Sequence, residues 1–437
     1  MLCKYESGAN MNKLLRSKRR GSTIVMAVLV LVILLATGVG LLNLGLNSRV
    51  YSLRNAQEIQ ARCAADAGLV KAIFELNDKL KTSPAELDGE AGSPSFPEAI
   101  NEVLPSSEAS FSYQITTDSV FAAMNGQDLA IESIGKGACN CVNECTCPTA
   151  KVCALVRLQG LFDNAMLVRN QLSLMPNTKV MAYNSEDPTD TDFDLKIGTT
   201  STASGQIPLG PGTVIDGDVF VGIGGDPNIV VGAGGTINGD KYSLTEEPYL
   251  PAITPPSLTD MGTPLLANGG TITMGVGDSG KYTGIDLKSV GGLPGVLEIN
   301  GGKVVLHITG DIDLGTGCQV IINSGSSLVI YTEGNIFAGN SAGFNNQGSD
   351  ARDFQVYTTG INNQVFNLKA GSSIFGIVYA PDVDIVLYPG TEVRGAIVGK
   401  SLQLKSGCTF YYDEALRDNV SMYDVGASFG VKRWQEE

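Results

Sequence analysis

The strongest constraint on this chain is an uncharged, apolar run near its N-terminus. Ser22 to Ser48 contains no Asp, Glu, Lys or Arg. As a helix this run would be about 40 Å long, enough to cross a hydrocarbon core of about 30 Å. A secretory signal peptide has a shorter apolar region of about 7–15 residues and a small-residue cleavage site, and neither is found here. The run therefore predicts one membrane-spanning helix.

The charges around this run predict its orientation. The basic residues Lys18, Arg19 and Arg20 lie immediately before it, and positive flanks stay in the cytoplasm. We therefore expect an inner-membrane protein with its C-terminal part in the periplasm. The net charge of the whole chain is −15, and from Ser22 onward it is −20. This acidic bulk lacks the positive potential that attracts phosphates, so we expect no nucleic-acid partner.

The phrase Arg19-Arg20-Gly21-Ser22-Thr23-Ile24-Val25-Met26 resembles the cleavage region of type IV prepilins. The resemblance implies cleavage between Gly21 and Ser22 by a prepilin peptidase, which also methylates the new N-terminus. Met11 is an alternative start that would give a leader of residues 11–21 and exclude Cys3. A plain uncleaved anchor explains the hydropathy equally well.

The helix is expected to continue past the membrane to residue 80. Residues 49–80 contain no Pro, and Leu69, Ile73, Leu76 and Leu80 recur on one helical face. The phrase A-R-C-A-A-D-A-G-L at residues 61–69 resembles the N-terminal region of PilX-type minor pilins. We expect this face to pack against its own domain as well.

One position departs from the pilin pattern. Pilins usually carry Glu five residues after the cleavage site, where this chain has Met26. A carboxylate inside the bilayer costs about 2.5–3.5 kcal/mol unless it is paired. The absence of this carboxylate at Met26 argues against a major pilin. It favours a minor or tip-located relative, including the large pseudopilin of type II secretion.

A cysteine cluster lies in the middle of the chain, at Cys139, Cys141, Cys145, Cys147 and Cys153. The spacings differ from the paired C-x2-C of common zinc sites, and an oxidising compartment favours disulfides. The pairing stays open, as do a metal site and free thiols. Because five is odd, Cys63 or one unpaired thiol completes the set.

The C-terminal half contains an imperfect repeat of short strands. An apolar pair, a polar residue, Gly-Asp or Gly-Asn and then Ile or Val recurs at residues 214–219, 307–312 and 331–336, and more loosely at 378–383. Periods such as 24 residues from Gly310 to Gly334 and 19 from Ala380 to Gly399 predict a solenoid of stacked coils. A β-sandwich is the alternative. Residues 246–265 interrupt the repeat as an extended surface insertion.

This half also resembles the β-helical domain attached to some PilX-type N-termini. The likeness lies in the ending Y-D-E-A-L at residues 412–416 and in Ile377-Val378-Tyr379-Ala380-Pro381. The resemblance implies no established activity. Cys318 and Cys408, each after a Gly and before a strand, are expected to be small buried residues.

Signals for catalysis are weak. His307 is the only histidine, so a Ser-His-Asp triad or a multi-His metal centre is not expected. The phrase at residues 275–282 partly matches a P-loop, but Tyr282 stands where Ser or Thr would hold Mg²⁺.

Two acidic patterns have simpler readings as well. Asp190, Asp192 and Asp194 alternate as in a calcium loop, but the turn Gly and the bidentate Glu are missing, so a solvated acidic turn is favoured. The polysaccharide-active enzymes built on β-helices need carboxylates and a basic residue on one face, and only Asp382, Asp384 and Arg394 suggest such a face.

The predicted fold is mainly β: a transmembrane, pilin-like helix, a small α+β region, and a C-terminal right-handed parallel β-helix. The expected boundaries are 1–21 for the leader, 22–80 for the helix, 81–160 for the Cys-containing region, 161–412 for the β-helix and 413–437 for a tail. The expected function is that of a structural minor pilin or pseudopilin-like subunit, with no enzymatic activity, cofactor or metal. Its partners would be the prepilin peptidase, other pilins or pseudopilins, the pilus assembly platform and the inner membrane. The alternative is a membrane-anchored carbohydrate-binding protein or polysaccharide-active enzyme.

Overall fold

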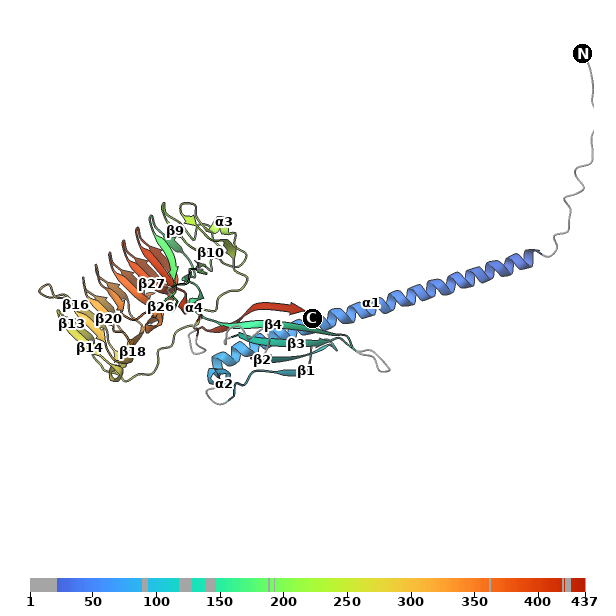
Figure 1. Ribbon diagram of the computed structural model, residues 1–437, viewed down its shortest axis with the longest axis horizontal. Coiled ribbons are helices and arrows are strands. Elements are labelled where there is room, and N and C mark those ends of the chain that lie inside the picture. The colour runs from blue at the N-terminus through green and yellow to red at the C-terminus, as the bar shows by residue number, and fades with distance from the viewer. Residues whose placement is uncertain are drawn as a thin grey trace, which may run out of the picture.

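The computed structural model consists of a long helix, a helix–sheet unit and a stack of β-coils (Figure 1). It describes residues 22–88, 93–117, 128–138, 147–187, 189–191, 193–360, 363–418, 420 and 426–436. The predicted leader, residues 1–21, lies outside the described residues.

The long helix α1 runs without interruption from Ser22 to Thr82. At 1.5 Å per residue its 61 residues extend about 90 Å, far more than a membrane requires. The helix thus ends two residues beyond the boundary expected at residue 80. Pro84 starts the short helix α2 (Pro84–Asp88), because a proline is tolerated in the first turn of a helix but not in its interior.

A five-stranded antiparallel sheet covers the C-terminal half of α1. Its order is β1 (Ala99–Val103), β2 (Ser110–Thr116), β3 (Asp128–Lys136), β4 (Thr149–Gln159) and β29 (Ser428–Glu436). Residues along β2 alternate between buried and partly exposed, as a sheet with one packed face requires. The expected tail at 413–437 is therefore corrected, since residues 428–436 complete this sheet.

The remaining strands form one 24-stranded sheet in which neighbours from successive coils pair in parallel. They are β5 (Met166–Val168), β6 (Leu172–Leu174), β7 (Lys179–Tyr183), β8 (Lys196–Thr199), β9 (Val214–Ile215), β10 (Asp218–Val221), β11 (Thr236–Ile237), β12 (Lys241–Ser243), β13 (Leu265–Asn268), β14 (Thr271–Met274), β15 (Gly280–Tyr282), β16 (Ile285–Lys288), β17 (Val296–Ile299), β18 (Gly302–Ile308), β19 (Ile312–Leu314), β20 (Gln319–Ile322), β21 (Ser326–Thr332), β22 (Ile336–Ala338), β23 (Gly343–Asn346), β24 (Phe354–Thr358), β25 (Val365–Leu368), β26 (Ser373–Leu387), β27 (Glu392–Leu404) and β28 (Thr409–Asp413). Short helices interrupt them at η2 (Leu161–Asp163), α3 (Pro227–Val230), η3 (Val276–Asp278), η4 (Ala351–Asp353) and α4 (Ala415–Asp418).

The register of these strands shows how the sequence repeat becomes a stack. Ala380 pairs directly with Gly399, so the 19-residue period equals one coil. A Cβ on Gly334 would lie 2.1 Å from the Gly310 carbonyl oxygen, so the 24-residue period also places equivalent corners on top of each other. Inward-facing apolar side chains form a continuous buried ladder at Leu306, Ile330, Val356, Val378, Ile397 and Met166.

The Gly-Asp and Gly-Asn phrases link successive coils. Asp311 Oδ1 accepts hydrogen bonds from the backbone N–H of Asn335 at 2.8 Å and from its side-chain amide at 3.1 Å. The Asp218 carboxylate accepts in the same way from the backbone N–H of Asp240 at 2.7 Å. The acidic residue thus satisfies a corner N–H of the next coil, which explains its place in the repeat.

The coils do not stack in sequence order. The first coil, β5–β7, lies in the middle of the stack. Strands β8–β12 extend the stack in one direction from this coil, and we call them the first arm. Residues 244–264 then lead to the opposite end of the stack, where β13 begins the second arm. This second arm returns until β27 and β28 pair with β5, β6 and β7. The chain therefore leaves the stack beside the point where it entered, which allows β29 to pair with β4.

The structure confirms a mainly β protein with parallel coils after a long N-terminal helix. The interruption expected at 246–265 corresponds to the connection between the two arms. The Tyr379 hydroxyl donates a hydrogen bond of 2.7 Å to the Pro251 carbonyl, and Leu250 and Ile253 pack on the stack. The insertion is thus fixed to the stack surface.

Candidate functional site

The N-terminal half of α1 is apolar and exposed. No residue is buried in its most hydropathic window, whose mean hydropathy is 2.9, and the helix is long and apolar enough to cross a membrane by length and composition. The exposed side chains include Ile24, Leu31 and Leu42, at 75%, 59% and 66% of their full area. Such a surface requires lipid or apolar protein neighbours.

The C-terminal half of α1 has one buried face. The buried residues Ala61, Ala64, Ala65, Gly68, Leu69, Ala72, Leu76 and Leu80 follow helical spacing. The phrase A-R-C-A-A-D-A-G-L therefore supplies the small side chains of this face. The expectation that the stripe packs against its own domain agrees with these contacts.

These small residues allow an unusually close approach between α1 and β3. A Cβ on Gly135 would lie 2.0 Å from the Ala61 carbonyl oxygen and 2.4 Å from the Ala65 nitrogen. The buried Ser133 hydroxyl donates a hydrogen bond of 2.7 Å to the Ala65 carbonyl. The backbones of α1 and β3 are thus in direct contact, and a larger side chain at these positions of the helix or the strand would not fit.

The opposite face of α1 carries an apolar stripe. Ile59, Val70 and Phe74 are 61%, 67% and 69% exposed, and their spacings of 11 and 4 residues place them on one side of the helix. No described residue covers them. Beside the stripe, Lys71 pairs with Glu102 at 2.5 Å and with Glu75 at 3.4 Å. A helix in which both faces are apolar can bind its own sheet and a second surface at once.

The predicted processing and topology residues stand at the start of α1. Ser22 is the first residue of α1, while Lys18, Arg19, Arg20 and Gly21 lie outside the described residues. The cleavage between Gly21 and Ser22 therefore stays a prediction.

The cysteine cluster is described only in part. Cys139, Cys141 and Cys145 lie outside the described residues, whereas Cys147 is disulfide-bonded and Cys153 lies in β4. Cys63 is an exposed thiol on α1. Among the described residues, no group of three His, Cys, Asp or Glu side chains could hold a metal ion.

Cys318 and Cys408 are buried thiols, at 0% and 1% exposure. Burial raises the pKa of the Cys408 thiol. Both therefore serve as small core side chains at their corners, the role expected from the sequence.

The other side chains singled out in the sequence are spread over the stack. His307 Nε2 lies 2.8 Å from the Glu333 carboxylate, and the residue is 9% exposed. Asp382 forms an ion pair with Arg169 at 2.5 Å.

Arg394 contacts neither of the aspartates proposed to share its face. It pairs with Glu392 at 2.8 Å, while Asp384 lies 3.5 Å from Lys400. The three residues suggested as a polysaccharide-cleaving face therefore have separate partners.

The acidic loop at 184–194 is organised by the Y-D-E-A-L ending. The buried Asp413 carboxylate accepts a hydrogen bond of 3.0 Å from the Ser185 N–H, and Glu414 accepts one of 3.0 Å from the Asp194 N–H. Burial raises the pKa of Asp413. The Asp190 carboxylate accepts a hydrogen bond of 3.3 Å from the Asn184 side-chain amide, and Asp192 lies outside the described residues. The described part of the loop is thus held by buried carboxylates.

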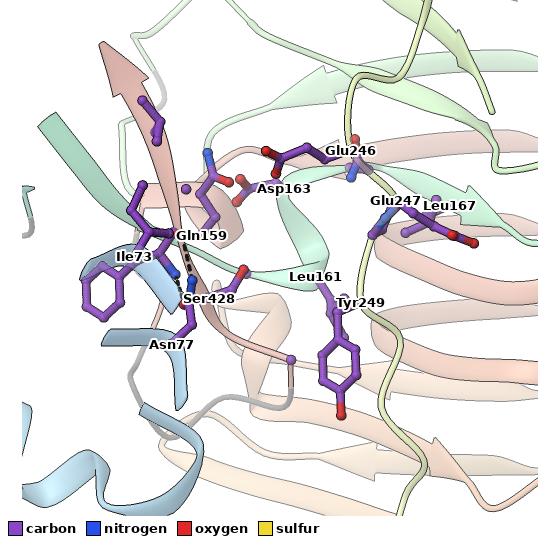
Figure 2. Close-up of a pocket in the computed structure, with 17 residues that line it drawn as sticks. Ile73, Asn77, Gln159, Leu161, Asp163, Leu167, Glu246, Glu247, Tyr249 and Ser428 are labelled. Atoms are coloured by element: carbon purple, nitrogen blue, oxygen red, sulfur yellow. Dashed lines mark hydrogen bonds between the residues drawn. The ribbon is translucent and has the colours of Figure 1, made fainter. Parts of the chain in front are cut away.

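A cavity of about 380 Å³ lies where α1, β29 and the stack meet (Figure 2). Asn77 on α1 donates to the Phe429 carbonyl at 3.1 Å and accepts from the Phe429 N–H at 2.6 Å, and so holds β29 like a neighbouring strand. Asp163 lines the same cavity, and burial raises its pKa to about 6. Sequence analysis did not predict this junction, because the contact that closes it joins Asn77 to Phe429, 352 residues apart.

Comparisons with known proteins match part of the chain to one family model and the chain to several solved structures. A family described as a domain of unknown function (DUF7305) matches residues 258–419. A search of curated proteins found no match.

Among solved structures, the chain is similar to the competence-associated pilin ComZ from Thermus thermophilus at 13% identity and a TM-score of 0.23, over 87% of this chain and 97% of that one. It is similar to a glycosylated ice-binding protein from an Arctic yeast at 12% identity and a TM-score of 0.28, over 57% and 90%. For an ice-binding protein from Antarctomyces psychrotrophicus the identity is 15% and the TM-score 0.29, over 57% and 94%. TM-scores this low do not establish a shared fold.

Proposed function

We propose that this chain is a structural subunit of a type IV pilus or a related secretion filament, of the minor pilin or pseudopilin kind. The observation that carries the proposal is α1: one uninterrupted helix with an exposed apolar N-terminal half and a C-terminal half packed on an antiparallel sheet. Before assembly the N-terminal half lies in the inner membrane, and the sheet and stack lie in the periplasm.

The second apolar face of α1 supports a role in assembly. Ile59, Val70 and Phe74 would remain exposed to water if the unit were a monomer on a membrane anchor. Burying a large apolar side chain contributes about 1.5–3 kcal/mol. Contact with the helices of other pilins or pseudopilins would therefore stabilise the subunit, and Met26 in place of Glu fits a minor position.

The coil stack is the displayed part of this subunit. We propose that it is a right-handed parallel β-helix without enzymatic activity, and that the N-terminal region is of the PilX type. The prepilin peptidase and the assembly platform would be the partners that process and insert it.

The N-terminus tests the proposal. The full chain is produced with and without an active prepilin peptidase, and the mature N-terminus is identified by mass spectrometry. A chain beginning at Ser22, with or without N-methylation, supports export through the pilin pathway. A Gly21→Leu variant should keep its leader.

An intact leader on the unmodified chain, with the peptidase active on a control prepilin, would overturn the proposal. The protein would then be a coil stack on a plain membrane anchor.

Assembly is tested separately on the exposed stripe. Phe74→Asp should lower the amount of protein in the sheared filament fraction at least tenfold, because a buried unpaired charge is strongly unfavourable. Arg62→Asp, on an exposed polar position of the same helix, is the matched control. Equal incorporation of both variants would exclude this face from the filament contact.

A further inference from the structure

A groove of about 410 Å³ lies on the stack, and its lining includes Phe375 and Arg394, which pair in register on successive coils. Tyr411, in register with Arg394 on the next coil, continues this row beside the groove. At about 4.8 Å per coil the row from Phe375 to Tyr411 spans about 10 Å. We call this groove the Phe375 groove.

The groove and the coil beside it combine two aromatic rings with a cation. Phe375 and Tyr411 are half-buried, and the Arg394 guanidinium lies 5.5 Å from the centre of the Tyr411 ring. Arg394 Nε donates to Glu392 at 2.8 Å, so the guanidinium is fixed in position. Within the described residues, its two terminal nitrogens have no protein acceptor and can donate to a ligand.

One wall of the groove is a rigid loop from the preceding coil. Asn346, which lines the groove, donates from its side chain to the Asp350 carbonyl at 2.7 Å and accepts from the Gly348 N–H at 2.8 Å. Asp350 in turn accepts at 2.8 Å from the N–H of Arg352. These bonds hold the wall without a ligand, and a preformed site loses less entropy on binding.

Glycines in the neighbouring coils allow this wall to pack closely against them. A Cβ on Gly395 would lie 2.1 Å from the Gly376 carbonyl oxygen and 3.4 Å from the Ala351 Cβ, and Gly395 has a φ of +125° that other residues rarely adopt. The Ala351 end of the wall therefore lies close against this corner. Arg352 extends from the wall to Glu186 at 3.4 Å and joins it to the acidic loop at 184–194.

We propose that the Phe375 groove binds an uncharged saccharide. An exposed amide at Asn345, the Ser373 hydroxyl and the free guanidinium nitrogens supply donors and acceptors for hydroxyl groups. The aromatic side chains supply flat apolar surface for the C–H faces of a sugar ring. The volume and these mixed polar and apolar groups suit a small ligand or a short stretch of a polymer.

Charge and backbone pairing favour this ligand over others. The exported part of the chain has a net charge of −20, and Arg394 is already neutralised by Glu392, so a polyanion would be repelled. A peptide added as a strand needs an open sheet edge, whereas β26 and β27 are paired on both sides here. This inference does not depend on assembly of α1 into a filament.

The test measures binding of the full chain in detergent micelles to a defined saccharide panel. Malto-, cello- and manno-oligosaccharides are the neutral probes, and alginate and heparin fragments are the acidic ones. We expect at least one neutral probe to bind. Phe375→Ala and Arg394→Gln should each weaken its binding about tenfold or more.

Lys369→Gln is the matched control, because Lys369 lies 3.9 Å above the Tyr388 ring at another part of the surface. It should change the affinity less than twofold. Circular dichroism checks that every variant is folded. Absence of binding by every neutral probe, preference for the acidic probes, or full affinity in folded Phe375→Ala would each overturn the proposal.

Discussion

The contact between α1 and β3 makes a sharp prediction for Gly135. The backbone of Gly135 has no positive φ, so alanine is conformationally allowed there. The added Cβ would nevertheless lie 2.0 Å from the Ala61 oxygen and 2.4 Å from the Ala65 nitrogen. Both atoms are backbone, so no side-chain rotation relieves the clash, and α1 must move away from β3.

The magnitude follows from this displacement. Overpacking a well-packed interior costs about 1–3 kcal/mol. Moving α1 by about 1 Å would also weaken the Ser133–Ala65 hydrogen bond of 2.7 Å, a further loss of about 1 kcal/mol. For a unit of this size a loss of about 2–4 kcal/mol lowers the melting temperature by roughly 10–20 °C.

The assay uses the single tryptophan. Trp434 lies on β29, in the sheet that packs on α1, so its fluorescence reports this unit and not the stack. Gly277→Ala is the control, because a Cβ there meets no atom within 4 Å. Gly135→Ala should lower the transition seen by Trp434, whereas Gly277→Ala should leave it unchanged. Equal transitions in the two variants would refute the close contact.

Three further substitutions probe other contacts. Burial raises the pKa of Asp163 in the folded state to about 6 from its ordinary value of 3.8, so the folded state holds this proton more tightly and stability falls as the pH rises from about 4 to 6. Asp163→Asn should remove this slope and raise the free energy of unfolding at pH 7 by on the order of 1–3 kcal/mol, measured by urea unfolding. Tyr379→Phe removes the hydrogen bond to Pro251, and limited proteolysis should then cut the connecting segment faster, consistent with a loss of about 1 kcal/mol. Ser133→Ala should lower the free energy of unfolding, followed by Trp434 fluorescence, by about 1 kcal/mol because the hydrogen bond to Ala65 is lost.

Matched variants separate these effects from general destabilisation. Glu247→Gln, which lines the same cavity as Asp163, should keep the pH slope of the unmodified chain. Tyr388→Phe should leave the proteolysis rate unchanged. A pH slope that persists in Asp163→Asn, or equal proteolysis of the two tyrosine variants, would contradict the assignments.

The sequence predicted what depends on local pattern. The uncharged run and the helical spacing from Leu69 to Leu80 placed α1 to within two residues of its end. The distance from Ala380 to Gly399 predicted one coil, because stacking in register requires equivalent residues to recur after one turn.

What the sequence did not predict depends on pairings between distant segments. The tail predicted at 413–437 includes β29, because nine residues carry no sign that their partner β4 lies more than 260 residues earlier. The order of the coils was not predicted either, because the repeat does not show whether two coils that are consecutive in sequence also stack on each other. Gly135 and Ser133 were also missed, although two small residues in an otherwise apolar strand are a usable signal of close backbone approach.

The position of β29 determines how the stack is attached. The chain enters the stack after β4 and returns from it to form β29. The stack is therefore an insertion between two adjacent strands of the five-stranded sheet. A domain held by a single linker can swing freely, whereas two paired strands restrict rotation about either one. Asn77 also fixes β29, the strand that follows the stack, to α1 by hydrogen-bonding both backbone groups of Phe429. The direction of the stack is therefore coupled to the axis of α1, and a subunit fixed through that helix would present the Phe375 groove in a defined orientation.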